Sequence, residues 1–157
     1  MCLIIDANVA HKFTVPPHED VAPVVSWLLS KKKRRLPRLA VGGKLRKELH
    51  KAGEAIRRFL RILDEAGRLY DVDDDLVDAE TQAVVELLEE ADEKSDDPHV
   101  LALARVSGSR LLASDDSRSG LHALFKDRRF LNPPGKVYKK AAHERLLRKA
   151  PDCKDAE

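Results

Sequence analysis

The 157-residue sequence contains no apolar run near the roughly 20 residues that a bilayer-spanning helix needs. It also lacks a signal-peptide pattern, because no basic segment precedes the first apolar run and Asp6 interrupts that run early. Cysteine is scarce, and Cys2 and Cys153 lie at opposite ends of the chain. Two free thiols in a reducing cytoplasm is the simpler interpretation, and a disulfide is the alternative. We therefore expect a cytoplasmic protein with no membrane association.

Zinc-type spacing is absent as well. The six histidines are scattered along the chain, so we assign none of them a ligand role; they are His11, His18, His50, His99, His122 and His143. The sequence contains no internal repeat, low-complexity segment or second domain. These absences predict a single domain over residues 1–150, followed by a frayed tail over residues 151–157.

A large net charge is also missing, but the value of +2 hides a strong segregation. Residues 31–68 contain 14 Lys and Arg against 4 Asp and Glu, whereas residues 71–97 contain 13 acids against one Lys. A basic block of this size suits a polyanion, and the alternative is a set of solvated helix faces that pair with each other. The candidate nucleic-acid-binding residues lie on two predicted helices: Lys44, Arg46, Lys47, Lys51, Arg57 and Arg58.

Apolar runs of strand length alternate with segments of helical periodicity. We predict strands at residues 3–5, 38–41, 69–72, 110–113 and 136–138, and helices at 7–13, 21–30, 44–52, 54–66, 73–91, 98–106, 121–125 and 139–149. This alternation is typical of a three-layer α/β/α fold with a mostly parallel sheet.

Carboxylates follow two of the predicted strands. Asp6 ends the run Leu3-Ile4-Ile5, and Asp115 and Asp116 come after the strand at 110–113. Ligands bind at the carboxyl ends of strands in open α/β sheets, although an Asp such as Asp6 also serves as a helix N-cap. Because this edge is shared by parallel strands, we expect these carboxylates to converge.

Two further acids occur in unusual settings. Glu48 is the only acid on a basic helix, where its alternative role is an ion pair with Lys44 or Lys51. Asp97 precedes Pro98 and begins a predominantly apolar helix, with Asp96 as the alternative. Converging carboxylates repel one another, and Mg²⁺ or Mn²⁺ is the usual partner for such a set. Together with a basic surface, this predicts a metal-dependent nuclease.

Taken in order, four segments resemble a PIN domain. They are Ile5-Asp6-Ala7-Asn8, Glu48 in a helix after a strand, Asp97-Pro98-His99-Val100-Leu101-Ala102-Leu103-Ala104, and Leu111-Leu112-Ala113-Ser114-Asp115-Asp116. PIN domains are metal-dependent ribonucleases, and often the toxin of a toxin–antitoxin pair. The resemblance covers nearly the whole chain and implies a PIN-like fold that cuts RNA.

Residue by residue, the resemblance implies catalytic metal ligands for Mg²⁺ or Mn²⁺ at Asp6, Glu48 and Asp97. The fourth ligand is Asp116 or Asp115, and Asp116 fits the Ser/Thr-x-Asp pattern better. Asn8 and Ser114 would be supporting polar groups. The implied partners are an RNA substrate, an antitoxin protein and a second copy of the chain. The segment around Trp27 is a candidate dimer face, although we expect a core position for this residue.

Other carboxylate-rich folds fit less well. A haloacid-dehalogenase-type phosphotransferase needs a second Asp where this chain has Asn8. A response-regulator receiver needs paired acids near the start of the chain and a Lys after a late strand. The remaining alternative is a PIN-like module that binds RNA or a protein without cutting.

Overall fold

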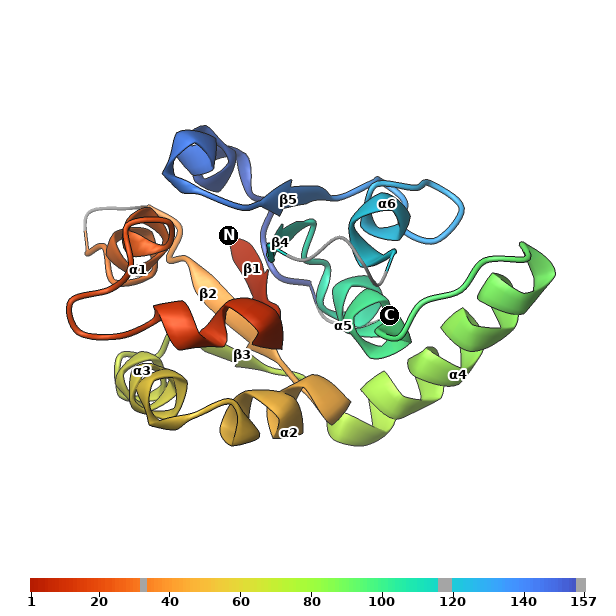
Figure 1. Ribbon diagram of the computed structural model, residues 1–157, viewed down its shortest axis with the longest axis horizontal. Helices are drawn as coiled ribbons and strands as arrows, with labels where there is room; N and C mark the ends of the chain where they lie inside the picture. The colour runs from red at the N-terminus through yellow and green to blue at the C-terminus, as the bar shows by residue number, and fades with distance from the viewer. Residues whose placement is uncertain (32–33, 116–119, 155–157) are drawn as a thin grey trace.

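The computed structural model describes residues 1–31, 34–115 and 120–154, and it shows a five-stranded sheet with helices on both faces (Figure 1). The strand order is β3-β2-β1-β4-β5, and every neighbouring pair is parallel. The predicted three-layer α/β/α fold is therefore confirmed, and the sheet is entirely parallel.

The strands agree with the predicted ones to within one residue at either end. They are β1 (Cys2–Ile5), β2 (Arg38–Val41), β3 (Leu69–Asp71), β4 (Leu111–Ala113) and β5 (Lys136–Tyr138). All four residues of β1 are fully buried because it is the central strand and helices cover both of its faces. Burying a branched apolar side chain contributes roughly 1.5–3 kcal/mol, so β1 anchors the core.

The α-helices are α1 (Ala22–Leu28), α2 (Gly43–Lys51), α3 (Glu54–Glu65), α4 (Asp74–Glu90), α5 (Pro98–Ser107) and α6 (Leu121–Phe125). Two predicted helices are instead 3₁₀ helices, η1 (Ala7–Lys12) and η2 (Ala141–Lys149). The hydrogen bonds of a 3₁₀ helix span three residues instead of the four of an α-helix. In a segment as short as η1, the 3₁₀ pattern therefore satisfies more N–H groups. Trp27 on α1 is buried, which confirms the expected core position.

The order in which the chain adds strands to the sheet reverses at the central strand, β1. It passes from β1 outward to β2 and β3, and then returns through α4 and α5 to β4, beside β1. Right-handed crossovers consequently place α1 and α3 on one face and α5 and α6 on the other (Figure 1). The carboxyl ends of β1 and β4 therefore flank the topological switch point, where open α/β sheets bind their ligands.

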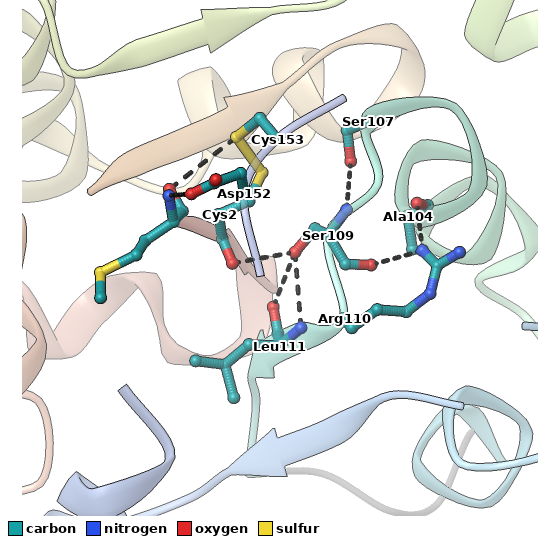
Figure 2. The surroundings of a disulfide bond; sticks show 9 residues. Cys2, Ala104, Ser107, Ser109, Arg110, Leu111, Asp152 and Cys153 are labelled. Atoms are coloured by element: carbon teal, nitrogen blue, oxygen red, sulfur yellow. Dashed lines mark hydrogen bonds and ion pairs between the residues drawn. A yellow bond between two sulfur atoms is a disulfide. The ribbon is translucent and has the colours of Figure 1, made fainter. Parts of the chain in front are cut away.

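The two ends of the chain are joined, which corrects the expectation of free thiols. Cys2 and Cys153 form a disulfide with a Cα–Cα distance of 4.9 Å (Figure 2). The Met1 ammonium donates to Oδ1 of Asp152 at 2.6 Å, and the Lys154 N–H donates to the Ser107 carbonyl at 2.6 Å. We call these three contacts the terminal clasp. Residues 151–154 are thus held against the fold rather than frayed, and the cysteines no longer argue for a reducing compartment.

The helices of the described residues differ from bilayer-spanning helices. None of them combines the length and the apolarity that crossing a membrane requires.

Candidate metal centre

Three side chains from two helices meet beside the carboxyl end of the sheet. The donor atoms of Glu48, Asp97 and His99 all lie within 4.8 Å of one another. Glu48 projects from α2, whereas Asp97 and His99 flank Pro98 at the start of α5. We call these three residues the Glu48 cluster. Its two carboxylates and one imidazole are ordinary protein ligands for a divalent cation, so it can bind a metal.

Glu48 reaches this position because α2 starts immediately after β2. Gly43 has a φ of +59°, which glycine adopts at little cost. A Cβ there would also lie 2.6 Å from a methyl carbon of Val77 on α4, so no other residue fits without a shift. The Gly43 N–H donates to Oδ1 of Asp74 at 2.7 Å. These constraints hold the start of α2 against α4 and direct Glu48 toward α5.

Asp97 is the N-terminal flanking residue of α5, as predicted, and Pro98 occupies the first turn. The side chain of Asp97 makes no capping hydrogen bond, so its carboxylate oxygens remain available to a ligand. Ser95 provides the local support instead, because its Oγ accepts from the Asp97 N–H at 3.1 Å. Asp96, the alternative considered from the sequence, is exposed and lies outside the cluster.

His99 is the residue of this cluster that the sequence interpretation missed. Its side chain is 3% exposed, and Nε2 contacts Oε1 of Glu48. This contact replaces the ion pair with Lys44 or Lys51 that we weighed for Glu48; neither lysine pairs with it in the described part. With Glu48 ionised, Nε2 must carry the proton. The sequence did contain a signal for this role. Asp97 and His99 are two residues apart at a predicted helix start, so both side chains project from the beginning of the same helix.

Asp6 lies beside the Glu48 cluster at the end of β1. Asp6 is the N-cap residue of η1, and the Ser114 hydroxyl donates to its Oδ2 at 3.0 Å. Asn8 and His122 both contact the same hydroxyl oxygen, at 3.2 Å from Nδ2 and 2.7 Å from Nε2. The predicted supporting residues Asn8 and Ser114 are therefore joined in one network around Asp6. His122 was not predicted, because an isolated histidine in a short helix carries no spacing signal.

The environment of Asp6 opposes its ionised form. Burial is the largest cause and raises the pKa of this carboxyl above its usual 3.8, with the Ser114 hydroxyl acting in the opposite direction. The negative charges of Asp97 and Glu48 raise the pKa further. Three carboxylates thus act on one another without a Lys or Arg pairing with Asp6 among the described residues, and a bound cation would relieve this repulsion.

The candidate fourth ligand differs from the other three. Asp115 pairs with Lys12 at 3.0 Å, and Lys12 also binds Asp20 at 3.0 Å. An ammonium that neutralises Asp115 removes the need for a metal at that carboxylate, and Asp115 is not part of the Glu48 cluster. Asp116, the preferred candidate, lies outside the described residues.

Most of the predicted nucleic-acid-binding residues are exposed on α2 and α3, namely Lys44, Lys47, Lys51, Arg57 and Arg58. Arg46 differs, because its guanidinium binds Asp71 at 2.5 Å and Asp74 at 3.3 Å. It therefore joins α2 to the end of β3 and the start of α4. Lys44 and Lys51 lie four residues before and three after Glu48, so they share its side of the helix. A basic surface consequently borders the candidate metal site.

Searches against protein-family models, curated proteins and solved structures found no match to the chain. The interpretation of the site therefore depends on its own residues and their geometry.

Proposed function

We propose that the protein is a metal-dependent endoribonuclease of the PIN type, in which Mg²⁺ or Mn²⁺ is held by Asp6, Glu48 and Asp97. The observation that carries the proposal is the convergence of the Glu48 cluster to within 4.8 Å beside a buried Asp6. Carboxylates brought this close without a Lys or Arg partner among the described residues destabilise the fold, and a bound cation would offset that loss.

The residues of the site have separate roles in this proposal. Asp6, Glu48 and Asp97 would hold the cation, which would supply Lewis-acid activation of a water for attack on a phosphodiester and charge stabilisation of the leaving oxygen. His99 holds the Glu48 carboxylate through Nε2 and so orients it, as outer-shell groups do in metal sites. Ser114 orients Asp6 in the same manner. Lys44 and Lys51 attract the phosphate backbone to the side of α2 that bears Glu48.

The test combines a metal-binding measurement with a cleavage assay. Mn²⁺ binding is followed by loss of the free-ion signal in electron paramagnetic resonance, and cleavage is followed with labelled single-stranded RNA in Mn²⁺, Mg²⁺ or EDTA. Asp97→Asn and Glu48→Gln should each lower Mn²⁺ affinity and abolish metal-dependent cutting. The matched control is Asp96→Asn, which changes a neighbouring exposed carboxylate and should leave both readouts unchanged.

Two results would count against the proposal. Cutting that survives in Asp97→Asn or persists in EDTA would place the activity elsewhere. Mn²⁺ binding by the Glu48 cluster without any cutting, together with salt-sensitive RNA binding, would favour the alternative of a non-catalytic module that binds RNA through α2 and α3.

A further inference from the structure

A second charged site lies at the opposite edge of the sheet. A pocket of about 420 Å³ is lined by Arg105, Arg110, Arg128 and Arg129, with Glu80 as the only acid among the described residues of its wall. We call it the arginine pocket. Arg110 directly precedes β4 and Ser114 directly follows it, so the two sites are separated by the length of that strand, roughly 13 Å. The arginine pocket is therefore distinct from the candidate metal centre.

Acidic side chains bind two of these guanidinium groups. Arg105 pairs with Glu80 at 2.5 Å, and Arg129 pairs with Asp127 at 2.7 Å and with Glu93 at 3.2 Å. These pairs leave Nη2 of Arg105 and Nη1 of Arg129 without a hydrogen bond in the described part of the chain. Both arginines are thus held in place but retain donors.

Arg110 has no acidic partner within the described ranges. Its Nη1 donates to the carbonyls of Ala104 and Ser109 at 2.8 and 2.9 Å (Figure 2), and Nη2 donates to Asn132 at 3.4 Å. Nε is buried and makes no hydrogen bond to any residue that the structure describes. Burial lowers the pKa of this guanidinium, and the neighbouring charge of Arg105 lowers it further. If Arg110 served only to cap the C-terminus of α5, its contact with the Ala104 carbonyl would be explained. The repulsion between Arg110 and Arg105 would remain uncompensated.

Arg128 adds a fourth guanidinium, which is exposed and has no ion pair within the described residues. The described lining of the pocket therefore carries four arginines and one acid, and Asp127 and Glu93 offset part of the charge of Arg129 from outside the lining. Planar guanidinium forks match the oxygens of phosphate, and several of them together suit a doubly charged anion. The volume falls within the roughly 300–1,000 Å³ typical of small-molecule sites.

We propose that the arginine pocket binds a phosphate group, either free or carried by a small molecule such as a nucleotide. The site requires no metal, because its own arginines supply the positive charge. It is independent of the proposed nuclease function, and either proposal can fail without the other.

The experiment titrates the protein with inorganic phosphate, diphosphate and a nucleoside monophosphate by isothermal calorimetry. EDTA is present throughout, so that phosphate cannot bind through a cation at the Glu48 cluster. Comparison of the three probes separates a free phosphate from a nucleotide as the preferred source. We expect saturable binding that weakens as salt increases.

Three variants locate the site. Arg110→Gln should weaken binding about tenfold, because a charged hydrogen-bond donor is lost. Arg128→Gln should weaken phosphate binding about threefold. The side chain of Arg128 is exposed and makes no described contact that folding needs, so this variant still tests the proposal if Arg110→Gln does not fold. Arg145→Gln, an exposed arginine of η2 outside the pocket, is the matched control and should bind as the wild type does. Absence of saturable binding, or equal loss in Arg128→Gln and Arg145→Gln, would overturn the proposal.

Discussion

The two ends of β1 show opposite electrostatic arrangements only a few residues apart. At the amino end, the terminal clasp pairs the Met1 ammonium with Asp152 and closes the disulfide from Cys2. At the carboxyl end, Asp6 is 7% exposed and feels the like charges of neighbouring carboxylates. Opposite charges and a covalent bond stabilise the fold at one end, whereas buried like charges weaken it at the other. Such a loss of stability is common where a site must bind a ligand.

The largest expected effect comes from breaking the clasp. Because the disulfide closes a loop across a sequence separation of 151 residues, reduction should lower the free energy of unfolding by about 2–5 kcal/mol. The measurement is urea unfolding with and without dithiothreitol. Cys153→Ser is the control: it should be equally destabilised and insensitive to the reductant. Equal stability of the oxidised and reduced wild type would contradict this prediction.

The next effect concerns the metal at the other end of the strand. Glu48→Gln should reduce Mn²⁺ affinity by about 100-fold, because a charged ligand is replaced by a neutral one. His99→Gln should reduce it by about tenfold, since the orientation of Glu48 is lost while its charge remains. Calorimetric titration with Mn²⁺ measures both. If His99→Gln costs as much as Glu48→Gln, the imidazole is a direct ligand.

Asp6→Asn should stabilise the metal-free protein by about 0.5–2 kcal/mol at neutral pH. The pKa of Asp6 is raised in the fold, so wild-type stability is fully present below the unfolded value of 3.8 and declines as the pH rises through the folded value. The advantage of the variant should consequently appear above about pH 4 and vanish below it. Thermal unfolding of the wild type and Asp6→Asn in EDTA, at pH values above and below about 4, measures this difference in stability. Added Mn²⁺ should stabilise the wild type and not the variant; the reverse order would refute the argument.

The smallest effect is expected at the rim of the clasp. The Met1 ammonium and Arg35 lower the pKa of Asp152 to about 2, so its contribution is present above 3.8 and is lost as the pH falls from 3.8 toward 2. Asp152 is 40% exposed, and screening therefore limits the loss in Asp152→Asn to less than about 1 kcal/mol at pH 7. Chemical unfolding at pH 7 and pH 2.5 tests this: the difference should shrink at pH 2.5, and an undiminished difference there would argue against an ionic origin.

Local signals in the sequence were sufficient for the strands and for the edge where the carboxylates gather. The run Leu3-Ile4-Ile5 is apolar enough to require burial on both faces, and Pro98 after Asp97 marks a helix start by its fixed φ. Both features depend on neighbouring residues alone. The sequence thus determined the parallel α/β architecture and the positions of Asp6 and Asp97 within it.

Only the tertiary structure decided which side chains meet. His99 lies 51 residues from Glu48, and its role depends on how α2 packs beside α5. Asp115 would resemble a ligand by position, yet Lys12 reaches it from η1. Cys2 pairs with Cys153 because η2 returns the tail to the first strand, across 151 residues. Such contacts arise from the packing of distant elements, and no local pattern encodes the distance between them.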